Sequence, residues 1–547
     1  MATDRRPSRI GVIGGGIAGL IAARDLAAAG ADVLLLESSE RLGGRIRREE
    51  LDGMHIDIGA ESFATRGGGV EELLADLGLQ DALVRPAPLG AWVVEQRSGS
   101  GRDGAAHAVP LPSAGAIGIP AEPLSRASRR ALGLVGALRA SIEPLLPHSI
   151  GQGSSSVAEL VRARLGRRVL DRLVRPVALG VYSADPADLD ISAVSGLASA
   201  FARRGSLVAA AVELRGSRTA AGSAVAGLRL GMASLVDALT DELERHSAVV
   251  RLGAHVERIL PLADAEPSRP SQCGWGLGGT WGEEVVDAVV LAVPERPARW
   301  LLGDRRPEQV AGLCAAHDRV EVIAIALDAP ELDSAPRGTG ALVASGDAHG
   351  RDGTLAGEPR TDAEAGAGPD SGADPTPRIL AKALTHVTAK WPARAAAAGA
   401  GRHVLRLSYG RTGAAPETAQ RDDATTLRIA LRDASRILGK DIRPEMVRGM
   451  VRREWRIGHP TTSPPRTPPG IVLAGDWVSG TGIASVVPGA RAAAEQALQQ
   501  AESAAVDAAA EATATEAKAE ATTTDGTASA ERRPLAPDAH FEGATAA

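Results

Sequence analysis

A glycine-rich turn between an apolar strand and a helix is the feature that most restricts how this chain can fold. The apolar run that starts at Arg9 leads into Gly14, Gly16 and Gly19, a helix follows, and a second apolar run ends in Glu37. Gly14 permits a tight turn, Gly16 lets the backbone approach a pyrophosphate, and Gly19 lets the helix pack closely on the strand. This order predicts a Rossmann-like βαβ unit.

The same unit has the chemistry to bind a dinucleotide. The N-terminus of the helix presents free N–H groups and the positive end of its dipole to phosphates. Glu37 lies eighteen positions after Gly19, where a carboxylate can accept hydrogen bonds from ribose hydroxyls. A 2′-phosphate would be repelled there, which disfavours NADP. The alternative is a glycine turn with a purely structural role.

Two further segments indicate which dinucleotide binds. Residues 37–45 (ESSERLGGR) continue the motif, and residues 57–63 (DIGAESF) follow shortly after. Both resemble the FAD-binding segments of the flavin amine oxidase superfamily, where the first carries the ribose carboxylate and a glycine loop and the second meets the flavin. The guanidinium of Arg45 is a fixed fork of donors that suits a phosphate or the flavin edge, and a solvated loop arginine is the alternative. An NAD dehydrogenase has no need of the second glycine loop, so FAD is the predicted cofactor.

A second FAD motif lies near the C-terminal end of the chain. Residues 470–477 (GIVLAGDW) read as a strand, and residues 480–486 (GTGIASV) form a glycine turn that opens a helix running to about Gln499. Asp476 can accept from the ribityl chain or order nearby water. A helix that begins near Ile483 aims its N–H groups at the flavin N1–C2=O edge, where reduction deposits negative charge. A plain strand, turn and helix is the alternative.

The resemblance implies two more contacts and completes the predicted site. Residues 255–259 match a strand whose backbone meets the adenine through Val256, and residues 453–460 match a strand near the flavin that carries Trp455 but lacks the family's Pro-Gln-Tyr. The predicted cofactor-binding residues are Gly14, Gly15, Gly16, Ile17, Ala18, Gly19, Glu37, Ser38, Arg41, Gly44, Arg45, Gly59, Ala60, Glu61, Ser62, Val256, Trp455, Asp476, Ile483, Ala484 and Ser485. No catalytic side chain is predicted, because the flavin carries the chemistry, and no metal site is predicted.

Three segments, residues 107–120, 173–189 and 480–489, resemble the porphyrinogen oxidase branch of this superfamily. The chain departs from the branch at Val181 and at residues 190–192, where the family more often has Leu-Ser. The resemblance implies oxidation of a porphyrinogen to a porphyrin with O2 as acceptor. Six hydrogens leave in three turnovers of the FAD, and each turnover produces H2O2.

The resemblance favours coproporphyrinogen III as substrate, giving coproporphyrin III for haem biosynthesis. Mitochondrial members place an arginine, which meets a propionate, where this chain has Gly90 and Ala91. Coproporphyrinogen III carries four propionates and protoporphyrinogen IX carries two, so their recognition should differ. Protoporphyrinogen IX oxidase is the main alternative. An amine oxidase or carotenoid desaturase of the same superfamily and a non-catalytic escort protein with this fold are the others.

Composition excludes several other functions. The net charge is −6 and only 2% of the residues are aromatic, so neither a global attraction to nucleic acid nor a stacking platform for single strands is expected. Cys273 and Cys314 give no disulfide framework and no metal-ligand spacing. The chain has no run of about eighteen uncharged apolar residues, and its basic start before an apolar run is interpreted as the first strand and not as an exported leader. We expect a cytoplasmic protein, with peripheral membrane contact and handover to a downstream haem-pathway enzyme left open.

The pattern along the chain predicts an α/β fold with a Rossmann-like FAD-binding domain, an α+β substrate domain and an inserted helical subdomain. The predicted FAD-binding domain comprises residues 1–90, 227–300 and 451–499, the substrate domain residues 91–112 and 301–450, and the helical subdomain residues 113–226. Residues 331–377 lack periodicity and are predicted to form a mobile insertion. Residues 500–547 have few large apolar side chains and are predicted to be a disordered tail.

Four arginines gather in the predicted helical subdomain, at Arg167, Arg168, Arg172 and Arg175. A solvated helix face is one interpretation of this cluster. Contact of one or two of these arginines with an anionic substrate or with lipid headgroups is the other.

Overall fold

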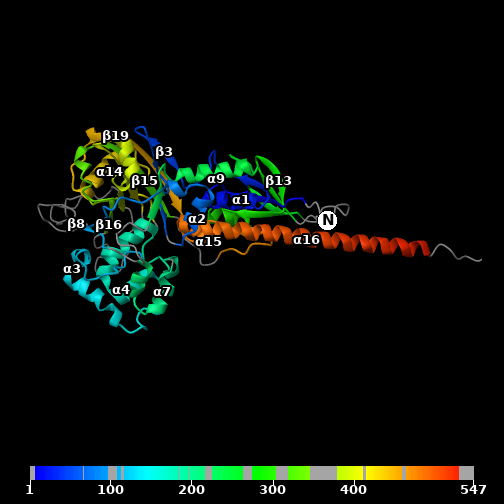
Figure 1. Cartoon of the computed structure of the whole chain (residues 1–547), viewed down its shortest axis with the longest axis horizontal. Helices are drawn as coiled ribbons and strands as arrows, with labels where there is room; N and C mark the ends of the chain where they lie inside the picture. Colours follow the sequence, from blue (N-terminus) through cyan, green and yellow to red (C-terminus); the bar gives the residue numbers. More distant parts are fainter. Residues whose placement is uncertain are drawn as a thin grey trace, which may run out of the picture.

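The computed structural model of the chain describes residues 6–65, 67–95, 107–112, 116–182, 184–194, 196–215, 225–262, 274–303, 318–344, 378–410, 414–458 and 464–528. Figure 1 shows three parts. One contains β13, α1, α9 and the beginning of the long helix α16, a second contains β15, β19 and α14, and a third contains α3, α4 and α7. We keep for them the names of the predicted domains to which these elements belong, namely FAD-binding domain, substrate domain and helical subdomain.

The FAD-binding domain is built on a parallel sheet. Within the described residues, five strands pair in the order β10, β2, β1, β14 and β20, and each pair is parallel. The bounds are β10 (Val249–Arg251), β2 (Asp32–Leu36), β1 (Arg9–Ile13), β14 (Ala288–Leu291) and β20 (Ile471–Leu473). In register, Ile10 lies beside Val33 and Ala288.

Both faces of this sheet are covered. Side chains such as Ile10 and Val12 pack against a helical layer, and Ile13 and Leu36 pack on the opposite face against an antiparallel sheet. The helical layer is α1 (Ile17–Ala28), α2 (Gly69–Asp76), α9 (Ala233–Arg245) and the first part of α16 (Ile483–Ala528), and the antiparallel sheet is β11 (Arg258–Pro261), β12 (Trp275–Gly279) and β13 (Gly282–Val286). Burial on both faces explains why the central strands are continuous apolar runs in the sequence.

The substrate domain is a mostly antiparallel sheet that holds a helix on one face. In the described part of the chain the strand order is β19, β15, β18, β17, β16, β7 and β8, and only β16 and β7 pair in parallel. The strands are β19 (Val447–Ile457), β15 (Asp318–Asp328), β18 (Arg402–Tyr409), β17 (Ala383–His386), β16 (Gly340–Ala344), β7 (Trp92–Glu95) and β8 (His107–Pro110). Helix α14 (Asp423–Leu438) buries Ala430, Ala434 and Ile437 against one face. The hairpin of β3 (Arg48–Leu51) and β4 (Met54–Asp57) packs with the other face, together with α12 (Val387–Lys390).

The helical subdomain packs around its own apolar core. Its longer helices are α3 (Arg126–Ser141), α4 (Val157–Leu165), α7 (Leu197–Arg204) and α8 (Leu207–Arg215), and a run of short helical turns crosses residues 167–182. Leu132, Val161, Leu173 and Leu207 meet in the core.

Three of the four clustered arginines pair with acidic side chains. Arg167 Nε lies 3.0 Å from Asp171, Arg172 Nε lies 3.2 Å from Glu95, and Arg175 pairs with Asp185. The guanidinium charges are thus used within the structure, which favours the first interpretation of the cluster over contact with a ligand.

The mobile insertion was predicted to begin at residue 331, which is too early in the chain. Residues 340–344 form β16, in the middle of the substrate-domain sheet, with Val343 fully buried. The strand is only five residues long and stands in a Gly- and Ala-rich stretch, so alternation of apolar residues was too brief to reveal it. Residues 345–377 of the predicted insertion lie outside the described residues.

The predicted disordered tail is also wrong in its first part. Helix α16 continues from Ile483 to Ala528, and Figure 1 shows it projecting well beyond the sheet it packs on. Alanine and glutamate have high helix propensity, which supports a helix even where little apolar surface is buried. Residues 529–547 lie outside the described residues. No helix in the described part of the chain is both long enough and apolar enough to cross a membrane.

Candidate FAD site

The turn from β1 to α1 has the geometry that a pyrophosphate requires. A Cβ at Gly14, where φ is +103°, would lie 2.6 Å from the Ala292 carbonyl oxygen. A Cβ at Gly19 would lie 1.8 Å from the Gly14 carbonyl oxygen, so only glycine fits at both positions. A Cβ at Gly16 would meet no heavy atom within 4 Å. Gly16 therefore faces open space at the start of α1, and the turn fits a phosphate placed there.

The first turn of α1 supplies donors at this point. Ile17 and Ala18 are its first residues, and Leu20 N donates to the Gly16 carbonyl at 2.9 Å. The N–H groups that precede this bond have no partner within the helix. They are the groups that the sequence predicted would meet the phosphates.

Glu37, at the end of β2, ties the turn to its own loop. Gly15 N donates to Glu37 Oε2 at 2.6 Å, Ser39 N donates to Oε1 at 2.8 Å, and Ser38 Oγ lies 3.4 Å from Oε1. An ionised carboxylate has about four acceptor positions. Glu37 can thus hold the turn and still accept from a ribose.

The second glycine loop packs directly on the first. Gly43 N donates to the Gly15 carbonyl at 2.8 Å, and a Cβ at Gly44 would lie 3.1 Å from the Gly16 Cα. The guanidinium of Arg41 donates to the Gly44 carbonyl at 2.7 Å and to the Leu42 carbonyl at 3.1 Å. Arg41 therefore orders this loop with its own side chain.

Arg45 and Asp476, predicted separately, contact each other. Arg45 Nη2 lies 2.5 Å from Asp476 Oδ2, although the two residues are 431 positions apart. Asp476 begins the short helix α15 (Asp476–Ser479), and the glycines that follow lead to α16. A Cβ at Gly482 would meet nothing within 4 Å. The N-terminus of α16 thus opens on free space, as a flavin edge requires.

The first turn of α16 begins at Ile483, where the sequence predicted a helix start. Ser485 N and Val486 N donate to the Gly482 carbonyl at 3.0 and 3.1 Å. The N–H groups of Ile483 and Ala484 come before these bonds and point out of the helix end.

The segment Gly59–Ser62 is held from several sides. Ala60 N donates to the Arg45 carbonyl at 3.0 Å, and Trp455 Nε1 donates to the Ile58 carbonyl at 3.2 Å. Trp455, which lies on β19, thus contacts the backbone of Ile58, the residue just before this segment.

Glu61 is the centre of a buried cluster of charges. Its Oε1 accepts from Trp391 Nε1 at 2.5 Å, its Oε2 accepts from Arg406 Nη1 at 2.6 Å, and Lys390 Nζ lies 3.5 Å away. Arg406 also donates to the Gly59 carbonyl at 2.8 Å. Burial by itself would raise the pKa of Glu61, but Lys390, Arg406 and Trp391 outweigh it and lower that pKa. Glu61 is therefore a carboxylate that fixes the segment, with its side chain bound to the substrate domain.

Arg406, Lys390 and Trp391 were not predicted. The available signal was a single arginine inside the otherwise apolar strand Val404–Leu407. A buried charge of this kind requires a partner, but the sequence does not show that the partner is Glu61, about 345 positions earlier.

Val256 lies near Glu37 but outside a strand. Ala254 N donates to the Glu37 carbonyl at 2.8 Å, and Gly253 N donates to the Ser39 carbonyl at 3.0 Å. Val256 is buried in the coil that precedes β11, which begins at Arg258. The adenine contact through Val256 stays a prediction, and the expectation of a strand at this residue is wrong.

Replacing Gly59 with alanine should lower stability and FAD content together. The added Cβ would lie 1.9 Å from the Arg45 carbonyl oxygen, so the backbone must shift, at a cost of about 1–3 kcal/mol. Gly458→Ala is the control, because its Cβ would come no closer than 3.9 Å to Trp477. Thermal melts and FAD absorbance of the purified variants check this. Equal FAD content in both would contradict it.

Asp57 should make stability depend on pH. Burial raises its pKa from about 3.8 to about 6, and the Met232 N–H and Arg394 only partly oppose this. Because the folded pKa lies above the unfolded one, Asp57 favours folding below about pH 4, and that benefit is lost as the pH rises through 6. A shift of about two units corresponds to roughly 3 kcal/mol. Urea unfolding of Asp57→Asn should therefore show a smaller fall in stability between pH 4.5 and 7 than the natural protein shows.

These features lie where the carboxyl ends of β1, β2 and β20 meet one edge of the parallel sheet, which is where doubly wound folds bind dinucleotides. Two glycine turns, the Glu37 carboxylate and a free helix N-terminus meet at this edge, which suits an FAD-dependent oxidoreductase. The chain belongs to the family of flavin containing amine oxidoreductases, whose profile matches residues 17–500. FAD is therefore the cofactor, as predicted.

Individual relatives agree with this assignment. The coproporphyrinogen III oxidase of Mycobacterium bovis is 29% identical over 495 residues, which cover 87% of this chain and 94% of the relative. That of Mycobacterium leprae is 29% identical over 506 residues, 88% of this chain and 97% of the relative.

The solved structures that resemble the chain share its fold. A protein from Exiguobacterium sp. 255-15, provisionally named a protoporphyrinogen oxidase, has a TM-score of 0.69 at 23% identity and covers 90% of this chain and 99% of its own. Cyclohexylamine oxidase from Brevibacterium oxydans has a TM-score of 0.57 at 17% identity, with coverage of 91% and 100%. The predicted α/β fold class is confirmed.

Proposed function

We propose that this protein oxidises coproporphyrinogen III to coproporphyrin III in haem biosynthesis, with FAD as cofactor and O2 as final acceptor. The observation that carries the proposal is the similarity to the mycobacterial coproporphyrinogen III oxidases over nearly the whole of both chains. Six hydrogens leave the substrate, so three O2 would be reduced to three H2O2 for each porphyrin formed. Bound FAD would supply the two-electron acceptor for each of the three steps.

The proposed roles of the protein's own residues follow from the geometry. The glycine turn at Gly14–Gly16 and the start of α1 would hold the pyrophosphate, and Glu37 would hold the ribose. The start of α16 would stabilise negative charge at the flavin edge, because its N–H groups and dipole point there. The Arg45–Asp476 pair would fix the ribityl region, since it joins the two FAD motifs. The Glu61 cluster would position the segment that lies against the flavin.

The test is porphyrin fluorescence after purified FAD-loaded protein is mixed with coproporphyrinogen III in air, with protoporphyrinogen IX run in parallel. We expect faster growth of emission with coproporphyrinogen III, above its autoxidation, and three H2O2 per coproporphyrin. Faster growth of emission with protoporphyrinogen IX would identify protoporphyrinogen IX as the substrate instead. No growth of emission with either substrate would contradict the proposal and would favour an amine oxidase or a carotenoid desaturase.

We also propose that the protein works in the cytoplasm, touches a membrane surface peripherally and passes its product to the next enzyme of the pathway. Support for membrane contact comes from α3 and the turn after it, where Leu134, Leu138 and Leu145 are 73, 60 and 84% exposed. The exposed charged residues on α3 itself, Arg126, Arg129 and Arg130, are all cationic. An apolar face with a cationic edge suits the surface of an anionic bilayer.

Sedimentation with phosphatidylglycerol vesicles tests membrane contact. The natural protein should sediment with these vesicles and much less with phosphatidylcholine. Leu134→Ser/Leu138→Ser should stay in the supernatant, whereas Leu260→Ser, which changes a leucine 55% exposed on β11, should behave like the natural protein. Equal sedimentation of both variants would contradict this role of α3.

A further inference from the structure

A small cavity lies between the FAD-binding and substrate domains, beside the Asp57–Glu61 segment. Its volume is about 180 Å³. Arg85, Arg229 and Arg394 line it, Asp57 and Glu61 are its buried acidic residues, and Trp391 supplies an apolar surface. The three arginines come from three separate segments of the chain, so the tertiary fold brings them together.

The acidic residues of this cavity are already bound to other groups. Asp57 accepts from Met232 N with both oxygens, at 3.0 and 3.1 Å, and Glu61 is held by Trp391 and Arg406. The arginines are mostly uncommitted. The side chain of Arg229 donates to the Asp81 carbonyl at 2.8 Å. The side chains of Arg85 and Arg394 make no hydrogen bond or ion pair with the described residues, although the charge of Arg394 partly opposes the rise in the pKa of Asp57.

Gly231 lies close to both Arg394 and Asp57. A Cβ there would lie 2.6 Å from Arg394 Nη2 and 2.7 Å from Asp57 Oδ2. Glycine at this position leaves the Arg394 guanidinium free to face the cavity beside Asp57. The φ of +95° at Gly231 also favours glycine.

The charges around the cavity favour an anion, but only one of low charge. The cavity arginines add three positive charges. Lys390 and Arg406 act on the Glu61 carboxylate, and Arg394 and Arg406 act on Asp57, so five cations surround two carboxylates. Those buried carboxylates still repel a second negative charge placed close to them. Val84 and Leu228 provide an aliphatic wall. We propose that this cavity binds a singly charged carboxylate group on a short aliphatic chain, with the carboxylate on Arg394 and Arg229 and the chain against Leu228.

Such a ligand would lie next to the segment that positions the flavin. Asp57 and Glu61 flank Gly59 and Ala60. An anion bound beside these two carboxylates would therefore change the electrostatic potential at that segment. The carboxylate can come from a free small acid or from a propionate arm of a porphyrin. The second source rests on the proposed function, and the first does not.

Titration of the FAD-loaded protein with sodium propionate tests the site. Binding is measured by saturation-transfer NMR at constant ionic strength, with sodium chloride as the reference salt. We expect saturable binding to the natural protein. Loss of one charge-assisted contact in Arg394→Met or Arg229→Gln should weaken it at least about tenfold. Arg296→Met is the matched control, because Arg296 is exposed on α10 (Glu295–Leu301) and away from the cavity, and it should bind propionate normally. Arg394→Lys should recover part of the affinity, which a general loss of folding would not allow.

The two sources are separated by coproporphyrin III binding, measured by quenching of porphyrin fluorescence. If the cavity holds a propionate arm, Arg394→Met weakens coproporphyrin binding and propionate competes with it. If it holds a free acid, coproporphyrin binding is unchanged in Arg394→Met while propionate binding is lost. Non-saturable propionate binding, or equal affinity in Arg394→Met and Arg296→Met, would overturn the proposal. A failure of the oxidase assay with intact propionate binding would affect the proposed function alone.

Discussion

Replacing Arg406 with methionine should lower the free energy of unfolding by about 3–5 kcal/mol and release much of the bound FAD. Arg406 is 9% exposed and joins β18 of the substrate domain to both the Glu61 carboxylate and the Gly59 carbonyl. Removal of Arg406 breaks a buried pair and leaves Glu61 with Lys390, 3.5 Å away, as its remaining cation. Loss of one partner of a buried pair costs about 3–5 kcal/mol. The same change frees the Gly59–Ser62 segment, so the flavin loses an ordered surface. Denaturant unfolding and the ratio of flavin to protein absorbance measure the two effects.

Arg402→Met is the matched control for this variant. Arg402 lies on the same strand, four positions earlier, and its partner Asp52 is 2.9 Å away, but its side chain is 40% exposed. Exposed ion pairs contribute about 0–1 kcal/mol, so the control should keep its stability and its FAD. Adding Glu61→Gln to Arg406→Met should recover part of the stability, because it removes the buried carboxylate that had lost its Arg406 partner. A single Arg406→Met variant as stable as Arg402→Met would show that Arg406 does not hold the segment.

The cofactor could be predicted because its sequence signals are local. Glycine at 14, 16 and 19 is required by contacts within the same turn, and the carboxylate at Glu37 follows a strand at a fixed distance. The structure adds that Gly15 N and Ser39 N bind this carboxylate. Spacing in the sequence does not reveal which acceptor positions of the Glu37 carboxylate bind backbone N–H groups and which remain for a ligand.

The contacts between distant segments could not be predicted in the same way. Arg45 and Asp476 were each identified as FAD residues, but their ion pair depends on how β20 lies beside β14 and β1. The cluster of Glu61 with Lys390, Trp391 and Arg406 depends on how the substrate domain sits on the FAD-binding domain. β16 was missed because a central strand can be short, and its burial comes from β7 and β17 on either side. The full length of α16 was not predicted, because the lack of large apolar residues after residue 500 was taken to indicate disorder and the high helix propensity of this stretch was given less weight.

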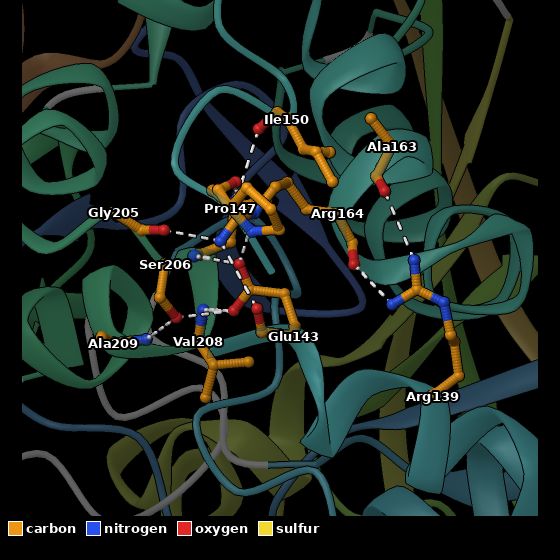
Figure 2. Close-up of polar contacts among 11 residues, drawn as sticks. Arg139, Glu143, Pro147, Ile150, Ala163, Arg164, Gly205, Ser206, Val208 and Ala209 are labelled. Atoms are coloured by element: carbon orange, nitrogen blue, oxygen red, sulfur yellow. Dashed lines mark hydrogen bonds and ion pairs between the residues drawn. The ribbon is translucent and has the colours of Figure 1, made fainter. Parts of the chain in front are cut away.

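The second large effect is expected in the helical subdomain, at Arg164. Figure 2 shows this guanidinium enclosed by Glu143, Pro147, Ile150 and Gly205. Both side chains of the Arg164–Glu143 pair are fully buried, with Arg164 Nε 2.6 Å from Glu143 Oε1. Arg164 also donates to the Pro147 carbonyl at 2.8 Å and to the Gly205 carbonyl at 2.5 Å. The guanidinium thus joins the chain before α4 to the turn between α7 and α8.

Glu143 completes the network from the other side. Its carboxylate accepts from Ser206 Oγ at 2.6 Å and from the backbone N–H groups of Leu207 and Val208 at 2.9 and 3.1 Å. These are the first N–H groups of α8, so Glu143 acts as a cap donated by a distant segment. Arg164→Met leaves this carboxylate buried and without its counter-charge, and should cost about 3–5 kcal/mol.

Arg203→Met in α7 provides the control, because Arg203 is 58% exposed and pairs with Glu213 at the surface, where a pair is worth about 0–1 kcal/mol. Hydrogen exchange should show lost protection at Leu207 and Val208 in Arg164→Met but not in Arg203→Met. FAD should stay bound in both variants, since the core of the helical subdomain is separate from the two cores around the parallel sheet. The double variant Glu143→Leu/Arg164→Met should regain much of the loss, because it buries no unpaired charge. Equal stability of Arg164→Met and Arg203→Met would mean that the subdomain is held by its apolar core alone, and simultaneous loss of FAD would mean that the two domains unfold as one unit.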